Sequence, residues 1–303
     1  MDIPDILERY YPLWVIVAVS TGIIFPEIKI FSAYSSILLA IMICSISLTV
    51  RSADLVSQDL NAVFIIFVLQ LMMPLIGFVL ALLFKLSEVF LLGIVLLGAV
   101  TPEFVTPVVT HLSRGDTSLS SAILLITGFG SVITIPIFTN ILIQTNITMD
   151  LTALVMDLVL ILLVPMSIGI FLKSWQPDII SAYDHYYSST ATIMLLLLIG
   201  IATAANSTFI QSQGMVIFVL VLVVLVMNLS GYGLGMFSGL FLDQQKMITA
   251  VYSVGMRDFA VAIALILSSR LAPVIALPAI LFGIVEMLTS SVMVKYFNSD
   301  KFL

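Results

Sequence analysis

The stretch Thr101-Pro102-Glu103-Phe104-Val105-Thr106-Pro107 places two prolines and a carboxylate in the middle of an apolar segment. Each proline lacks a backbone N–H donor and clashes with the preceding turn, so this stretch predicts a break in a helix. About 150 residues later, Ser253-Val254-Gly255-Met256-Arg257-Asp258 interrupts another apolar segment, and Gly255 weakens the helix there. These two interruptions, half a chain apart, decide the fold that we predict.

The composition predicts that most of the chain lies in a membrane. Of the 303 residues, 61% are hydrophobic and 9% are charged. A soluble domain has about half apolar and about a quarter charged residues. So few charges cannot cover a water-exposed surface. We therefore predict an all-α polytopic protein that spans the cytoplasmic (inner) membrane several times.

Short polar stretches separate ten apolar segments, and we interpret each segment as a membrane span, which takes about 20 residues. The segments are 12–26, 31–50, 61–84, 89–112, 117–145, 151–174, 188–208, 213–242, 246–269 and 271–297. Five spans separate the two interruptions, and an odd number reverses the orientation in the membrane. We therefore predict two inverted five-helix repeats, residues 1–147 and 148–303.

Paired broken helices in inverted repeats indicate the central site of a transporter. Unwound backbone at that depth must line a cavity or be buried in protein, because lipid cannot satisfy its hydrogen-bonding groups. The sequence therefore predicts that the two interruptions lie together at a polar site in the middle of the membrane.

The distribution of basic residues predicts that both termini are cytoplasmic. With that orientation, seven basic residues lie in the inside loops and tails and three in the outside loops, which is the bias that cytoplasmic loops show. The inside residues are Arg9, Arg51, Arg114, Lys173, Lys246, Lys295 and Lys301, and the outside residues are Lys29, Lys85 and Arg270. Arg257 belongs to no loop, because it lies in the second interruption.

Several classes of function are disfavoured. Cys44 is the single cysteine, two histidines are too few for a histidine metal site, and we expect no resident cofactor. The net charge of −6 argues against a nucleic acid partner. No Walker sequence is present, so ATP is not the direct energy source. The enzyme alternative is an intramembrane protease that uses Asp258 with Glu103 or Glu286, but its usual short motifs are absent, and we expect no enzymatic activity.

Five stretches, in order along the chain, carry a family resemblance. They are Met72-Met73-Pro74, Val108–Asp116, Leu163-Val164-Pro165, Val254-Gly255-Met256 and Ala272–Phe282. In these stretches the sequence resembles the bile acid:sodium symporter family, in particular its ten-span bacterial members. The resemblance implies a panel domain of spans 1, 2, 6 and 7 beside a core domain of spans 3–5 and 8–10, with spans 4 and 9 crossing at unwound centres. It also implies alternating access, through movement of the core against the panel.

The sequence departs from the family at the residues that bind sodium in spans 4 and 5. Where the family carries a Ser-Asn pair, this chain has Thr106 and Pro107. The serine of the fifth span persists as Ser120, but Leu124 replaces a nearby threonine ligand. A weak sodium site near Ser120, Thr106 and Asp258 is therefore kept as an alternative.

The ninth span departs further. The coordinating glutamate of the family is Ser253 here, and its glutamine is Arg257. A glutamine of the third span aligns with Leu69, although Gln70 is adjacent. A guanidinium group opposes a nearby metal cation, so we expect coupling to protons in preference to sodium. A sodium-coupled symporter with a modified ion site is the alternative.

Four charged residues lie at or near the predicted core: Glu103, Arg257, Asp258 and Glu286. A charge in the middle of a bilayer costs about 2.5–3.5 kcal/mol, so it persists mainly where it is paired or functional. One interpretation is that Glu103 or Asp258 takes and releases a proton, while Arg257 holds an anionic substrate or acts as an internal counter-ion. The other interpretation is a permanent ion pair of Arg257 with Glu103 or Asp258 that locks two broken helices together.

Neutral side chains at the interruptions complete the predicted site. Thr101, Thr106, Ser120, Ser253 and Gln70 are the candidates for hydrogen bonds to the solute or ion. A serine or threonine in a membrane helix more often bonds to its own backbone, which is the structural alternative. Helix N-termini created by the breaks favour anions. We therefore expect a secondary transporter of a small organic anion surrounded by membrane lipid. A non-transporting sensor is the second alternative, and a monomer is compatible with the sequence.

Overall fold

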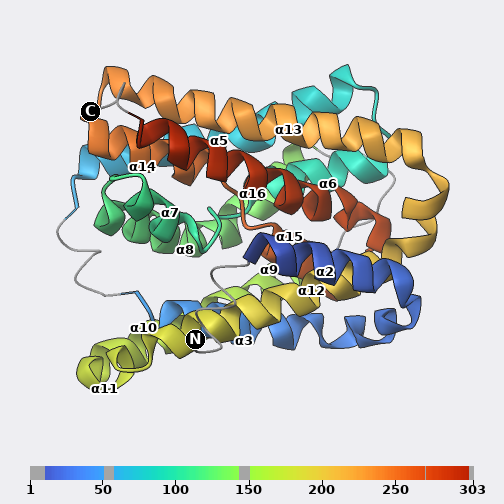
Figure 1. Cartoon of the computed structure of the whole chain (residues 1–303), viewed down its shortest axis with the longest axis horizontal. Coiled ribbons are helices and arrows are strands. Elements are labelled where there is room, and N and C mark those ends of the chain that lie inside the picture. Colours follow the sequence, from blue (N-terminus) through green and yellow to red (C-terminus); the bar gives the residue numbers. More distant parts are fainter. Residues whose placement is uncertain (1–10, 51–57, 143–150, 270, 300–303) are drawn as a thin grey trace.

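In the computed structural model of the chain, the described residues are 11–50, 58–142, 151–269 and 271–299, and every regular element among them is helical (Figure 1). The elements of the first half are α2 (Tyr11–Ile24), η1 (Pro26–Tyr34), α3 (Ser35–Ser47), α5 (Leu60–Leu83), α6 (Glu88–Ala99), α7 (Thr106–Leu112) and α8 (Thr117–Leu142). The elements of the second half are α9 (Leu151–Leu158), η2 (Val159–Leu163), α10 (Val164–Trp175), α11 (Pro177–Ser181), α12 (Asp184–Ser212), α13 (Gly214–Phe237), η3 (Ser238–Leu240), α14 (Gln244–Gly255), α15 (Phe259–Ser268), η4 (Pro273–Ala276) and α16 (Leu277–Phe297).

Eight helical stretches among the described residues are long and apolar enough to cross a bilayer. Two further apolar helices, Leu13–Ile24 and Glu88–Ala99, are shorter. Glu88–Ala99 is short because the segment predicted at 89–112 is divided between α6 and α7. The chain is therefore an all-helical, multi-pass membrane protein. The count of ten spans and the inverted repeat remain predictions.

Some of the predicted features lie outside the described residues. They are both chain termini, the basic residues Arg9, Arg51, Arg270 and Lys301, the end of the fifth predicted span (143–145) and the boundary between the repeats (147/148). The cytoplasmic orientation of the termini accordingly stays a prediction.

The helices pack in two groups. In the first group, α12 packs along α2 and α3, and α10 packs on α3. In the second group, α13 packs along α14, α16 and α5, while α5 also packs on α6. Figure 1 shows the first group along the lower edge of the view and the second group above it. The division into a panel and a core domain, and the movement of one against the other, remain predictions.

One ionic contact ties the starts of α5 and α14 together at the edge of the second group. Lys246 Nζ lies 2.8 Å from Asp59 Oδ2 and 3.2 Å from Asp243 Oδ2, and these two aspartates are the N-caps of α5 and α14. The hydrogen bond from Lys246 lowers the pKa of Asp59 below its ordinary value. Exposed ion pairs of this kind contribute little to stability. The contact therefore aligns the two helices more than it stabilises them.

Glycines allow α13 to pack closely against α14. A Cβ atom at Gly235 would overlap the Cα of Val251, and a Cβ at Gly231 would lie 2.6 Å from the Cα of Gly255. Gly233, on the same helix, has no atom within 4 Å of its Cβ position. Small residues let membrane helices approach each other in this way. This approach fixes the end of α14, where the second break begins.

We expect Gly235→Ala to lower the free energy of unfolding by about 1–3 kcal/mol, because the added methyl group has to displace the backbone of α14. Gly233→Ala is the matched control and should be neutral or slightly stabilising, since alanine favours a helix over glycine by about 1 kcal/mol. Thermal unfolding of the detergent-solubilised variants measures both effects. Equal midpoints for the two variants would contradict the close packing of α13 on α14.

Candidate functional site

The first predicted interruption is a break in the structure. α6 ends at Ala99, and Val100 adopts an extended conformation with φ −70° and ψ 167°. Residues 101–103 have no regular structure, and α7 begins at Thr106 with Pro107 in its first turn. A proline in the first turn of a helix costs no hydrogen bond, because that N–H has no partner within the helix. Pro102 therefore lies in the break itself, and Pro107 starts the next helix.

The second predicted interruption is also a break. α14 ends at Gly255, Met256 is extended, and Asp258 caps α15 by accepting a hydrogen bond from the Val261 N–H at 2.9 Å. Gly255 does not have a positive φ angle. It is required because a Cβ atom there would overlap the ring of Tyr232. The glycine thus serves the close approach of α13 and not an unusual backbone conformation.

The unwound parts of the two breaks contact each other, and we call this point of contact the crossing. The backbone N–H of Asp258 donates a hydrogen bond to the carbonyl oxygen of Thr101 at 2.9 Å. This bond joins the unwound part of one broken helix directly to that of the other. The two interrupted segments therefore meet at their unwound parts, as expected.

Three side chains donate hydrogen bonds to the carbonyl groups that the breaks leave without helical partners. The Val100 carbonyl accepts from Arg257 Nη1 at 3.0 Å, the Ser253 carbonyl from Gln70 Nε2 at 3.0 Å, and the Gly255 carbonyl from Asn228 Nδ2 at 3.1 Å. Carbonyl groups at helix ends need such partners, and lipid cannot supply them. These side chains therefore hold the crossing together.

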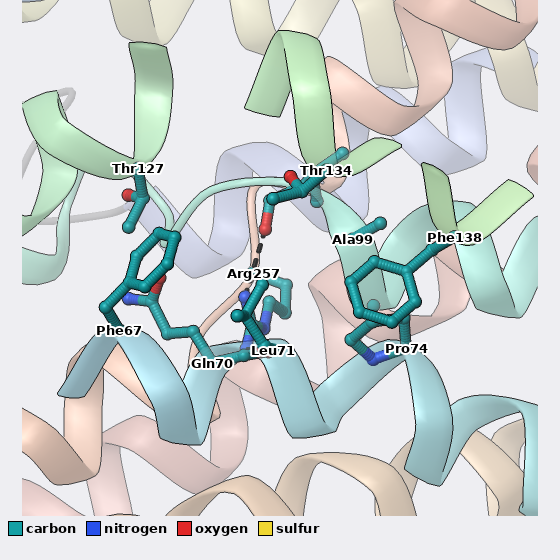
Figure 2. A pocket seen from close by; sticks show the side chains of 11 residues that line it. Phe67, Gln70, Leu71, Pro74, Ala99, Thr127, Thr134, Phe138 and Arg257 are labelled. Atoms are coloured by element: carbon teal, nitrogen blue, oxygen red, sulfur yellow. Dashed lines mark hydrogen bonds between the residues drawn. The ribbon is translucent and has the colours of Figure 1, made fainter. Parts of the chain in front are cut away.

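Arg257 also compensates for a proline in α5. Its Nη2 donates to the Gln70 carbonyl at 3.3 Å, and the residue four positions later is Pro74, which has no N–H to donate. Figure 2 shows the guanidinium beside Gln70 and Pro74, where these residues line a small cavity of about 20 Å³. Arg257 is 1% exposed. The guanidinium is thus bound to backbone oxygens of two helices.

These contacts of Arg257 were not part of the sequence-based interpretations, and its role as anion-binding group, counter-ion or ion-pair partner remains a prediction. Its guanidinium donates hydrogen bonds to the carbonyls of Val100 and Gln70. Glu286 accepts from the backbone N–H of Arg257 at 3.0 Å, and its charge acts on the guanidinium. The sequence did not predict this arrangement, because the unpaired carbonyls of α5 and α6 are far from Arg257 along the chain and close to it only in the folded structure.

A larger cavity of about 740 Å³ lies between the two helix groups. It is lined on one side by α3 and α12, and on the other by α7, α8, α16 and the two breaks. Glu103, Asp258 and Glu286 line its buried end and are 5%, 1% and 1% exposed. We call these three residues the acidic floor. The Arg257 side chain is not among the described residues that line this cavity.

The acidic floor is a cluster of interacting carboxyl groups. Glu103 is close enough to Glu286 for their side chains to share a hydrogen bond, and its charge acts on Asp258. Asp258 Oδ2 has no hydrogen-bond partner among the described residues. The three predicted carboxylates are thus brought together at the buried end of one cavity.

The other predicted site residues lie around the crossing and do not line the large cavity. The hydroxyl oxygens of Thr101, Thr106 and Ser253 are buried and have no hydrogen-bond partner in the described part of the chain. Ser120 accepts a hydrogen bond from Thr110 at 3.4 Å. Gln70 lies on the other side of the crossing, at the small cavity. No group of three or more Asp, Glu, His or Cys side chains among the described residues has a metal-binding arrangement.

Two residues at the opposite end of the large cavity were not identified as site residues from the sequence. His111 of α7 and Lys295 of α16 both line the cavity and are exposed. We call them the basic rim. Their sequence positions suggested only a cytoplasmic loop and a helix end. The spacing of nine residues between Glu286 and Lys295 places them on opposite faces of α16, so the sequence did not indicate that both line one cavity.

The chain is similar in sequence to known membrane transport proteins. A model of the Sodium Bile acid symporter family matches residues 36–213. The uncharacterized sodium-dependent transporter YocS of Bacillus subtilis (strain 168) is 24% identical over 294 residues, which cover 95% of this chain and 90% of that protein. The probable sodium/metabolite cotransporter BASS1 of Arabidopsis thaliana, a chloroplastic protein, is 24% identical over 297 residues, which cover 95% of this chain and 73% of that protein.

Proposed function

The chain belongs to the Sodium Bile acid symporter family, and on that premise we propose that it is a secondary active transporter that moves a small amphipathic organic anion by alternating access. We further propose that protons are the coupling ion and that both termini are cytoplasmic. The family is one of transporters, which agrees with the expected lack of enzymatic activity. The proposal requires no nucleic acid, no resident cofactor and no second subunit.

The large cavity is the observation that carries the proposal. Its volume of about 740 Å³ is within the range of small-molecule sites, about 300–1,000 Å³. It lies between two separately packed groups of helices, and the crossing of two broken helices forms its buried end. Movement of one group against the other would open this end to the opposite side of the membrane.

The acidic floor supports protons as the coupling ion. Three carboxyl groups so close together cannot all be ionised without strong mutual repulsion, and burial in a membrane adds to that cost. Binding of one or two protons removes the repulsion. The number of protons bound would then depend on which side of the membrane the floor faces.

Sodium is the alternative coupling ion, and a separate observation favours it. The buried oxygens of Thr101, Thr106, Ser253 and Asp258 that lack hydrogen-bond partners all belong to the two crossing segments. Neutral and anionic oxygens are ligands for alkali and alkaline-earth cations. The names of the relatives YocS and BASS1 also refer to sodium. We favour protons because the Arg257 guanidinium lies beside the same crossing.

A counterflow experiment tests the proposed carrier. Proteoliposomes loaded with unlabelled taurocholate, a bile acid conjugate that crosses lipid poorly, are diluted into labelled taurocholate, and the same is done with a panel of smaller organic anions. We expect transient accumulation of label for at least one anion. A channel would equilibrate the label without accumulation, and a sensor would show no flux. Either result for every anion tested would contradict the proposal.

A further inference from the structure

The two ends of the large cavity carry opposite charge. The acidic floor of Glu103, Asp258 and Glu286 is buried, whereas the basic rim of His111 and Lys295 is exposed. Glu286 and Lys295 lie nine residues apart on α16. With a rise of about 1.5 Å per residue, their backbones are about 13–14 Å apart along the helix axis. A bound solute that fills the cavity therefore meets both ends.

The wall between floor and rim is mainly apolar. It includes Met42 and Ile46 of α3, Leu124 of α8, Leu195 of α12, and Met287 and Val294 of α16. These side chains come from both helix groups. The apolar part of an elongated solute could be buried along this wall. One end of the solute would then contact the acidic floor and the other end the basic rim.

We propose that the basic rim binds the anionic group of the transported solute, and that the acidic floor accepts a hydrogen bond from a hydroxyl group at the other end. This inference rests on the proposed function and assigns the orientation of the solute within that site.

Electrostatics fixes this orientation. An anionic group at the floor would add a negative charge to three carboxyl groups, whereas at the rim it meets the Lys295 ammonium group and the His111 ring. Thr117 lies beside His111, with Oγ1 3.5 Å from Nδ1, and lines the same end of the cavity. Carboxyl oxygens at the floor accept hydrogen bonds from a hydroxyl group. Arg257 cannot take the role of the rim, because its guanidinium is bound to backbone carbonyls outside this cavity.

Three probes of one chain length test the inference by calorimetric binding to the purified full chain in detergent. They are 10-hydroxydecanoate, decanoate without the hydroxyl group, and 1,10-decanediol without the anionic group. We expect 10-hydroxydecanoate to bind about tenfold more tightly than either of the other two, which corresponds to about 1.4 kcal/mol. In Lys295→Met, 10-hydroxydecanoate should bind little more tightly than the diol. It should still bind more tightly than decanoate.

Arg114→Met is the matched control, because Arg114 is an exposed basic residue close to His111 in sequence that does not line the cavity. It should leave all three affinities unchanged. Full discrimination between 10-hydroxydecanoate and the diol in Lys295→Met, or no binding of any probe by the wild type, would overturn the inference. If a binding result of this kind were found and anion counterflow were still observed, the proposed carrier function would stand and only the orientation of the solute would be rejected. A correct order of affinities without counterflow of any anion would instead reject the carrier.

Discussion

Replacing Arg257 by methionine is expected to lower the free energy of unfolding by about 3–5 kcal/mol, the largest stability effect of any single substitution that we foresee. The variant loses hydrogen bonds to the carbonyls of Val100 and Gln70, each worth about 1.5–3 kcal/mol when the donor is charged. Both carbonyls are then buried without partners. Titration with a denaturing detergent, followed by circular dichroism, measures the change. Arg114→Met, at an exposed position, should have little effect.

A second substitution makes this prediction specific. Pro74→Ala supplies the N–H that the Gln70 carbonyl lacks within α5. In the Arg257→Met background it should therefore recover about 1 kcal/mol, the net value of a typical hydrogen bond. In the wild type the gain should be smaller, since Arg257 already bonds to that carbonyl. Strict additivity of the two substitutions would show that Arg257 does not compensate for Pro74.

Glu103→Gln is expected to uncouple transport from the proton gradient. Glutamine keeps the size and hydrogen-bonding capacity of the side chain but cannot bind and release a proton. Anion accumulation driven by an imposed pH gradient should fall at least about tenfold, an effect of more than about 1.4 kcal/mol, while counterflow without a gradient persists.

Glu88→Gln is the control for this substitution, because Glu88 is an exposed carboxylate at the start of α6, the helix that leads into the first break. It should accumulate the anion like the wild type. Glu103→Gln with undiminished proton-driven accumulation would remove Glu103 from the coupling mechanism. Loss of both counterflow and accumulation would instead assign Glu103 to solute binding or to the conformational change of the transport cycle.

The membrane class of the chain and the positions of both breaks could be predicted from the sequence, because they depend on local properties. Apolar runs, Pro102 and Pro107 act within one or two helical turns, whereas Gly255 marks the second break but is required by its contact with Tyr232. The segment 89–112 was predicted as one span with an interruption, and the structure divides it there into α6 and α7. The crossing itself was expected from family resemblance, and the bond from Asp258 to Thr101 was not predictable from spacing.

The contacts of Arg257 show what the sequence could not supply. A buried guanidinium can bond to a carboxylate or to an unpaired carbonyl, and three-dimensional position decides between them. Pro74 leaves its partner carbonyl open at residue 70, but nothing in the spacing of 183 residues between Pro74 and Arg257 (257 − 74) indicates that they meet. The basic rim was not predictable for the same reason, because the residues that line a cavity depend on how the two helix groups pack in three dimensions.

The most direct test of the central claim is to record proton and anion movement together through the wild-type protein. Proteoliposomes that contain a lumenal pH dye are given a gradient of the anion identified by counterflow, with and without sodium. The account predicts that the lumenal pH changes as the anion moves, that sodium is not required, and that Glu103→Gln abolishes the pH change. Anion accumulation that follows a sodium gradient and leaves the lumenal pH constant would contradict it.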